Sequence, residues 1–186
     1  MARQILITGG TSGIGAGIAA AFAAQGDRVT VTGATATEVE TAPGRAGTTA
    51  QVLDVRDGAA VQALVAALGP LDVVVNCAGV IRRGAEHDPV AFADTVDINL
   101  NGTMRVCAAA RPALAARRGC IINTASMLSF FGGGLVPGYS ASKGGVAQLT
   151  KSLAIAYAAD GIRVNAVAPG WIATPLTQAL QDDAAR

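Results

Sequence analysis

The stretch ILITGGTSGIG, residues 5–15, decides the fold, because it joins a short apolar strand to a helix through a run of glycines. Apolar side chains recur at helical spacing from about residue 13 to residue 25. Glycines at such a turn let the backbone approach a pyrophosphate, and the helix N-terminus offers unpaired N–H donors and the positive end of its dipole. A glycine cluster also forms ordinary tight turns, but its position directly after the first strand favours nucleotide binding.

The same alternation of strands and helices continues through the rest of the chain. Further strands are expected at residues 29–31, 50–53, 71–75, 120–123 and 162–167, and helices at 58–68, 89–117 (with a break near Gly102) and 139–159. Residues 35–49 show no such pattern and are expected to be a surface connection. The alternation predicts an α/β, Rossmann-type doubly wound parallel sheet that forms a single domain over residues 1–186.

Composition limits the class of protein. Hydrophobic residues make up 51% of the 186 and charged residues 15%, and the net charge is +1, which excludes disorder and a basic nucleic-acid or membrane footprint. No run reaches the roughly 18 apolar residues of a membrane span, and the N-terminus has no signal-peptide pattern. The three cysteines stand apart in apolar stretches, which is typical of reduced, buried thiols. We therefore expect a cytoplasmic protein without a metal site.

A tyrosine and a lysine stand four residues apart in the segment YSASK, residues 139–143. On a helix, side chains at this spacing share a face. An ammonium beside a phenol favours the phenolate, so we expect Lys143 to lower the pKa of Tyr139 from its usual value of about 10. Such a phenol can exchange a proton with a substrate oxygen near neutral pH. By itself the pair is equally compatible with an exposed helical pair that has no role.

This pair is one of several motifs that occur in a definite order along the chain. The others are the glycine run, Asn76-Cys77-Ala78-Gly79 after the fourth strand, Asn99, Ser126 after the fifth strand, and Pro169-Gly170 leading to Thr174. In this ordered set, and over essentially its whole length, the sequence resembles the short-chain dehydrogenase/reductase family. The resemblance implies a Rossmann fold, a cofactor that is NAD or NADP, and the interconversion of a secondary alcohol and a ketone.

The resemblance also implies roles for individual residues. Tyr139 would be the general acid/base, and Lys143 would lower its pKa and bind the nicotinamide ribose. Ser126 would polarise the substrate carbonyl, and Asn99 would hold a water that relays protons. The residues implied to contact the cofactor are Gly9, Ser12, Gly13, Ile14 and Gly15 at the phosphates, Asp54 and Val55 near the adenine, Asn76, Ala78 and Gly79 near the adenosine ribose, Tyr139 and Lys143, and Pro169, Gly170, Ile172 and Thr174 after the last strand.

Two features depart from the family pattern. Cys77 replaces the usual second asparagine of its motif, which we expect to leave the backbone geometry intact. The sequence also stops at Arg186, where the family ordinarily continues through another helix and a final strand that cap the substrate site. The alternative of another class is therefore a nucleotide-binding protein that does not catalyse a reaction.

The choice between NAD and NADP stays open at this level. In dinucleotide-binding folds an acidic residue at the end of the second strand binds the ribose 2′-OH and disfavours NADP. Here that position is about Gly33, followed by Ala34 and Thr35. Neither a carboxylate nor an arginine stands there.

Two segments bear on the substrate, VIRR at residues 80–83 and ASMLSF at residues 125–130. Both resemble the sugar-acid dehydrogenases of the family, especially those acting on 2-dehydro-3-deoxy-D-gluconate and the gluconate 5-dehydrogenases. Arg82 or Arg83 could bind a substrate carboxylate, although solvated loop arginines are an equally good interpretation. A 3-oxoacyl thioester is the alternative substrate, because the same catalytic set serves such reductases. The resemblance further implies a homodimer or homotetramer, with no nucleic-acid or membrane partner.

Overall fold

The computed structural model describes residues 2–178 and residue 182 of the chain. Six parallel strands form one sheet in the order β3-β2-β1-β4-β5-β6. The strands are β1 (Gln4–Thr8), β2 (Arg28–Gly33), β3 (Thr48–Val52), β4 (Val73–Asn76), β5 (Cys120–Thr124) and β6 (Arg163–Val167). The helices are α1 (Gly13–Ala24), α2 (Ala36–Glu40), α3 (Gly58–Leu68), α4 (Pro89–Val96), α5 (Gly102–Ala115) and α6 (Pro137–Ala156). This strand order confirms the predicted doubly wound parallel sheet.

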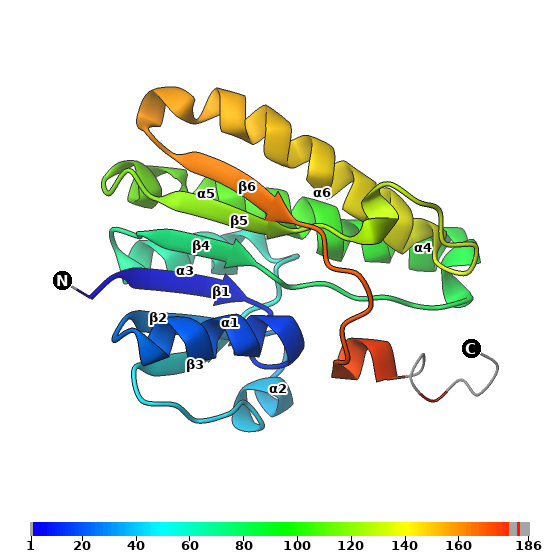
Figure 1. The fold of residues 1–186 in the computed structure, drawn as a ribbon, viewed down its shortest axis with the longest axis horizontal. Coiled ribbons are helices and arrows are strands. Elements are labelled where there is room, and N and C mark those ends of the chain that lie inside the picture. Colours follow the sequence, from blue (N-terminus) through cyan, green and yellow to red (C-terminus); the bar gives the residue numbers. More distant parts are fainter. Residues whose placement is uncertain (1, 179–181, 183–186) are drawn as a thin grey trace.

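Helices cover both faces of the sheet (Figure 1). Helix α1 packs on β1 and β2 on one face, whereas α3, α5 and α6 share the other face. Because side chains alternate across a strand, Ile5 and Ile7 of β1 pack with the α1 face and Leu6 packs with the opposite face. All three side chains are fully buried, so β1 is the central strand of both cores.

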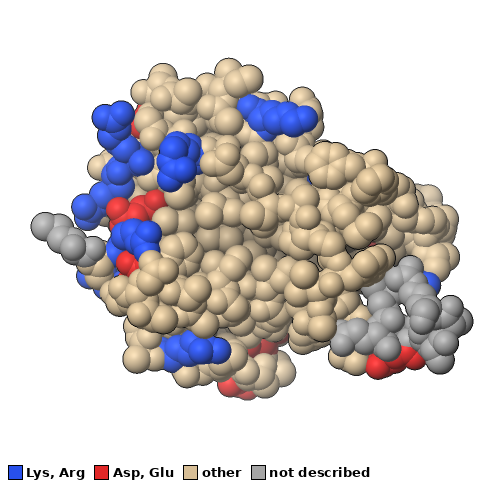
Figure 2. Space-filling view, viewed as in Figure 1, with Lys and Arg blue, Asp and Glu red and all other residues tan. Residues whose placement is uncertain are grey.

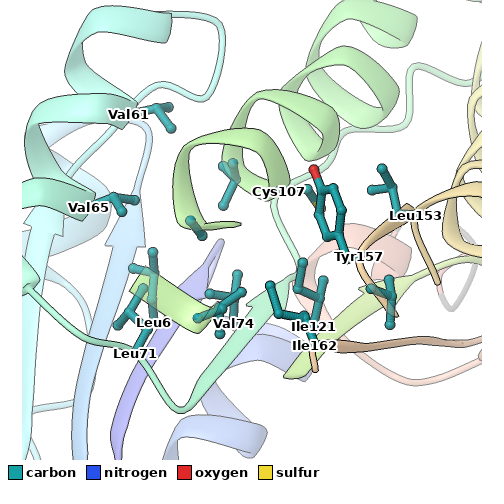
Figure 3. Packing of buried hydrophobic residues seen from close by; sticks show 14 of the residues in the cluster. Leu6, Val61, Val65, Leu71, Val74, Cys107, Ile121, Leu153, Tyr157 and Ile162 are labelled. Carbon is teal, nitrogen blue, oxygen red and sulfur yellow. The ribbon is translucent and has the colours of Figure 1, made fainter. Parts of the chain in front are cut away.

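The larger core lies between the sheet and helices α3, α5 and α6. Figure 3 shows Leu6, Val74 and Ile121 of three adjacent strands near Val61, Cys107 and Leu153 of the three helices. Cys107 is fully buried there, and this burial raises the pKa of its thiol to about 12. Cys107 therefore packs as a small apolar side chain. It is a free thiol, as are Cys77 and Cys120, which are partly buried.

The surface connection predicted over residues 35–49 is wrong in part, because this segment contains α2 and the start of β3. Thr35 is the N-cap of α2, and its hydroxyl accepts a hydrogen bond from the N–H of Glu38 at 3.2 Å. With five residues, α2 is too short to show the periodic apolar pattern on which a helix prediction depends.

The helix predicted over residues 89–117 is divided. Helix α4 ends at Val96, a π-helical turn covers Asp97–Asn101, and α5 begins at Gly102, where the predicted break falls. A Cβ atom on Gly102 would lie 2.5 Å from Cγ2 of Val55. Glycine therefore allows the start of α5 to pack against the loop after β3.

The carboxyl ends of the six parallel strands meet at one edge of the sheet, on the right in Figure 1. After β6 the chain passes this edge and forms a short 3₁₀ turn, Pro175–Thr177. The family's further helix and strand have no counterpart among residues 2–178, and Val167 at the end of β6 is exposed. Within this described part, no helix is long and apolar enough to cross a membrane. No group of three or more His, Cys, Asp or Glu residues is arranged there to hold a metal ion.

Candidate active site

A cleft of about 340 Å³ opens at the carboxyl ends of the strands. Doubly wound sheets bind their ligands at this edge, where the strand order reverses between β1 and β4. The cleft brings together every residue predicted to act in catalysis or to contact the cofactor, except Asn76 and Asn99. Those that line it are Gly9, Ser12, Gly13, Ile14, Gly15, Asp54, Val55, Ala78, Gly79, Ser126, Tyr139, Lys143, Pro169, Gly170, Ile172 and Thr174.

The turn between β1 and α1 depends on glycine at two places. Gly9 has a φ of +63°, and a Cβ atom there would lie 2.6 Å from the backbone nitrogen of Ala78. A Cβ atom on Gly15 would collide with the carbonyl oxygen of Gly9. Ser12, the N-cap of α1, makes no side-chain capping hydrogen bond, which leaves N–H donors of the first turn to a ligand. These residues fit the pyrophosphate of an NAD(P) cofactor.

The segment that follows β6 borders the same turn. A Cβ atom on Gly13 would be 3.4 Å from the Cβ of Thr174, so this threonine packs against the start of α1. Farther back, the N–H of Met127 donates a 3.0 Å hydrogen bond to the carbonyl of Pro169. The segment is therefore attached to the loop after β5 and forms one wall of the cleft.

Ser126, Tyr139 and Lys143 also come together on the cleft wall. Tyr139 lies in the first turn of α6, and the Lys143 Nζ atom is 5.6 Å from the centre of its ring. Ser126, just beyond β5, shares a hydrogen bond with the Tyr139 phenol. Lys143 is only 5% exposed, and its ammonium donates a 2.6 Å hydrogen bond to the carbonyl oxygen of Thr124. A phenol, a hydroxyl and an ammonium thus occupy one part of the cleft.

The predicted lowering of the Tyr139 pKa by Lys143 is wrong in this structure. Burial raises the pKa of Tyr139, and it outweighs the hydrogen bond with Ser126, which lowers this pKa. The Lys143 ammonium bonds to Thr124 and not to the phenol oxygen. Burial lowers the pKa of Lys143 to about 8. At neutral pH the site therefore holds a protonated phenol and a charged ammonium.

Glu86 is a buried carboxylate that the sequence analysis missed. It is 1% exposed, and its two oxygens accept the backbone N–H groups of Tyr139 and Arg82, each at 2.7 Å. Val136, the N-cap of α6, has no side chain that can cap the helix, so Glu86 from a distant loop takes that role. The carboxylate fixes the backbone that carries the phenol. Its sequence surroundings, AEHD, are typical of an exposed polar loop and contain no sign of this contact.

Asn99 and Asn76 lie beneath the cleft and do not line it. The fully buried Asn99 amide accepts the N–H of Val80 at 2.8 Å and donates to the carbonyl of the same residue at 3.0 Å and to the Ser142 hydroxyl at 3.0 Å. Asn76 Nδ2 donates to Asn123 Oδ1 at 2.9 Å. The structure therefore has the Asn76 side chain buried below the cleft, whereas Gly79 of the same motif lines it. Asn99 holds the loop after β4 in place.

Arg82, one of the two arginines predicted to bind a substrate carboxylate, lies at the end of a chain of ion pairs. Asp54 pairs with Arg56 at 2.6 Å, Arg56 with Asp94 at 2.9 Å, and Asp94 with Arg82 at 2.5 Å. Neither Arg82 nor Arg83 lines the cleft. The geometry thus gives no support to a site for a substrate carboxylate at either arginine. Both stand outside the cleft lining, and the Arg82 guanidinium is already paired with Asp94.

Glu38 is a second acidic residue that the sequence analysis missed, and unlike Glu86 it lines the cleft. Its Oε2 atom accepts the N–H of Ala34 at 2.8 Å, just after β2. A Cβ atom on Gly33 would lie 3.0 Å from this oxygen, so the glycine at the end of β2 leaves room for the carboxylate. An acidic residue three positions after Thr35 is a capping-box pattern, but it was not recognised because α2 itself was not predicted.

Comparison with known proteins agrees with this geometry. The sequence model of the short chain dehydrogenase family matches residues 3–185. The chain is 41% identical to 2-dehydro-3-deoxy-D-gluconate 5-dehydrogenase of Bacillus subtilis (strain 168), over 99% of this chain and 76% of that protein. It is 43% identical to a putative ketoacyl reductase of the monensin polyketide synthase from Streptomyces virginiae, over 95% of this chain and 73% of that protein.

A solved structure extends the likeness to the fold. Actinorhodin polyketide ketoreductase with NADPH superposes with a TM-score of 0.87 at 35% identity, covering 97% of this chain and 75% of that one. The chain thus spans about three quarters of the length of each of these three relatives. Sequence, strand order and cleft lead to the same assignment. The chain belongs to the short chain dehydrogenase family and is an oxidoreductase that uses NAD or NADP.

Proposed function

We propose that this oxidoreductase interconverts a secondary alcohol and a ketone on a sugar acid of the 2-dehydro-3-deoxy-D-gluconate type. One observation carries the reaction: Ser126, Tyr139 and Lys143 share a cleft with a glycine turn that fits a pyrophosphate. The bound cofactor supplies or accepts a hydride at its nicotinamide ring. The remaining task is to move one proton to or from the substrate oxygen, and the side chains perform it.

Tyr139 is the group that exchanges this proton. Its raised pKa keeps the phenol protonated at neutral pH, which suits donation to a carbonyl oxygen. Ser126 donates a hydrogen bond to the same substrate oxygen and stabilises the negative charge that develops on it. Lys143 is charged below about pH 8 and is held by the Thr124 carbonyl, and we assign it to binding the nicotinamide ribose of the cofactor. In the oxidation direction the same groups act in reverse.

The substrate class rests on similarity. The Bacillus subtilis relative is named for a sugar acid and matches nearly the whole chain. A 3-oxoacyl thioester is the second candidate, supported by the ketoacyl reductase relative and by exposed apolar side chains. Phe130 and Trp171 are 72% and 59% exposed on the loops after β5 and β6. An acyl chain would cover such side chains, whereas a sugar acid would leave them in water.

Steady-state kinetics followed by nicotinamide absorbance test the proposal. The substrates are 2-dehydro-3-deoxy-D-gluconate for oxidation, and keto-sugar acids and acetoacetyl thioesters for reduction, each with both nicotinamide cofactors. We expect kcat/KM to be at least about tenfold higher for the sugar acids, a difference of 1.4 kcal/mol in transition-state binding. The opposite ratio would support the thioester. Cofactor binding without turnover of any of these substrates would contradict the proposed reaction.

A further inference from the structure

A second cavity lies on the α1 face of the sheet, and none of its lining residues belongs to the cleft. Its volume is about 190 Å³. One water molecule occupies about 30 Å³ in the liquid, so the cavity has room for a small organic molecule. Residues of the glycine turn, α1, β2 and β3 line it, together with Val39 of α2 and the connection that follows this helix.

The cavity exists because a short helix and small side chains leave part of the sheet uncovered. Helix α2 has five residues, and none of them is buried. On the other side, α1 contributes only the methyl groups of Ala16 and Ala19. The sheet contributes Val31 of β2 and its neighbour Ala50 of β3, which are paired in register. The walls between α1 and the sheet are therefore apolar.

One end of the cavity carries a cation. Arg45 is exposed, and its guanidinium has no ion-pair or hydrogen-bond partner among the described residues. Basic atoms stand at the lower edge of the molecule in Figure 2, next to acidic atoms, in the region of α2 and the connection that follows it in Figure 1. The positive charge of Arg45 is therefore available to an anion at the end of an apolar cavity.

A tight turn joins Arg45 to Thr48, which also lines the cavity. The Thr48 N–H donates a 3.1 Å hydrogen bond to the Arg45 carbonyl, and Gly47 between them has the φ of +79° that a type II turn requires at its third residue. The Gly47 carbonyl accepts the N–H of Val29 at 2.8 Å, so the turn is attached to β2. Arg45 and Thr48 are thus fixed at the same end of the cavity.

The Thr48 hydroxyl is a second polar group without a partner. Its oxygen is buried and makes no hydrogen bond with the described residues. Buried hydroxyls are nearly always hydrogen-bonded, so this one needs an explanation. Because no hydrogen bond holds the side chain in its present rotamer, rotation about the Cα–Cβ bond can turn the hydroxyl towards a group in the cavity.

We propose that this cavity binds a short aliphatic carboxylate, with its hydrocarbon chain between α1 and the sheet and its carboxylate on Arg45 and Thr48. A guanidinium and a hydroxyl both donate hydrogen bonds, and the guanidinium selects an anionic head group. A sugar acid does not fit, because its hydroxyl groups would lose their hydrogen bonds to water against the apolar walls. The site is therefore distinct from the substrate site, and the inference does not rest on the proposed function.

Titration of the ¹⁵N-labelled protein with pentanoate, followed in heteronuclear NMR spectra, tests the proposal. We expect the amide signals of Gly10, Val31 and Ala50 to shift until they saturate, with a dissociation constant on the order of 1 mM, while the signal of Ser126 in the cleft stays in place. Pentanol and pentylamine should bind roughly fivefold more weakly or worse, because neither offers an anion to Arg45. Acetate should also bind more weakly than pentanoate, because it lacks the hydrocarbon chain.

Two variants test the polar end of the cavity. Arg45→Gln should raise the dissociation constant of pentanoate roughly fivefold. Arg117→Gln is the matched control, because it removes the same charge from an exposed turn after α5 that does not line the cavity, and it should leave the constant unchanged. Thr48→Val should also raise the constant, but it should not lower the melting temperature, because the hydroxyl has no partner to lose in the free protein.

Three results would overturn the proposal. The first is the absence of any saturable shift with pentanoate, and the second is a set of shifts confined to residues of the cleft. The third is equal binding of pentanoate and pentanol together with an unchanged constant in Arg45→Gln, which would reduce the cavity to an apolar hollow without a head-group site. Because the readout is binding, a failure of sugar-acid turnover would leave this result intact.

Discussion

At the residue scale, Lys143 is the clearest case of a group whose charge opposes folding. The residue is 5% exposed, its ammonium bonds to the Thr124 carbonyl, and burial lowers its pKa from 10.5 to about 8. The unfolded chain therefore binds this proton more tightly than the folded chain does, which makes the folded state less stable below about pH 8. The penalty decreases as the pH rises from about 8 and is nearly gone at pH 10.5, where the folded state is neutral and the unfolded state is half protonated.

Replacing this residue by Lys143→Met should reveal the penalty. The free energy of unfolding of the wild type should increase relative to that of the variant by on the order of 3 kcal/mol between pH 7 and pH 10.5. Urea denaturation of both proteins across this range measures the difference. A difference that does not change with pH would show that burial does not lower the Lys143 pKa.

Glu86 is expected to act as a positioning residue. In Glu86→Gln an NH₂ group replaces one of the two carboxylate oxygens, and it cannot accept a hydrogen bond. The backbone N–H of either Tyr139 or Arg82 then loses its acceptor, which should lower the free energy of unfolding by about 1–3 kcal/mol. Because Tyr139 loses part of its anchor, kcat should fall while the dissociation constant of the cofactor stays the same. Asp88→Asn, which changes the N-cap of α4 in the same loop, should leave kcat unchanged. Equal kcat values for wild type and Glu86→Gln would contradict this role.

At the scale of elements, the turn between β1 and α1 requires glycine, whereas the middle of α1 does not. Gly9→Ala combines a φ of +63° with a close approach to Ala78 and should destabilise the fold by about 2 kcal/mol or more. Gly17 lies in the middle of α1, and a Cβ atom there would have nothing within 4 Å. Gly17→Ala should therefore stabilise the fold by about 0.5–1 kcal/mol. Thermal denaturation of the two variants measures both effects. Similar effects of the two substitutions would show that the turn is not constrained.

Long elements were predictable from the sequence because each buries one continuous apolar face. The helix predicted over residues 58–68 is α3, and the unbroken apolar run before residue 76 is β4 between two covered faces. Two shorter features were not predictable. Helix α2 has too few residues for a period, and the change from i→i+4 to i→i+5 hydrogen bonds in the π-helical turn at Asp97–Asn101 leaves no mark in its sequence, DINLN. The sequence could locate the break near Gly102 but not its form.

At the scale of the whole molecule, the sequence predicted which residues meet but not every contact they make. Strand order brings Gly9, Ser126 and Tyr139 to one edge of the sheet, and alternating strands and helices are sufficient to predict that edge. The role of Glu86 depends on a contact with Tyr139, 53 residues away, which no sequence pattern indicates. Burial also reversed the expected pKa shift of Tyr139, because the sequence shows charge spacing and not solvent exclusion. Assembly into a dimer or tetramer stays a prediction.

The most direct test of the account compares Tyr139→Phe with Tyr157→Phe, the two tyrosines of the chain. Tyr157 is 4% exposed in the larger core and does not line the cleft, so its variant controls for loss of a buried hydroxyl. Tyr139→Phe should lower kcat by about 10²- to 10⁴-fold and leave the cofactor dissociation constant within about threefold of its wild-type value. Tyr157→Phe should retain wild-type kcat. Wild-type turnover in Tyr139→Phe would contradict the claim that this phenol exchanges the proton.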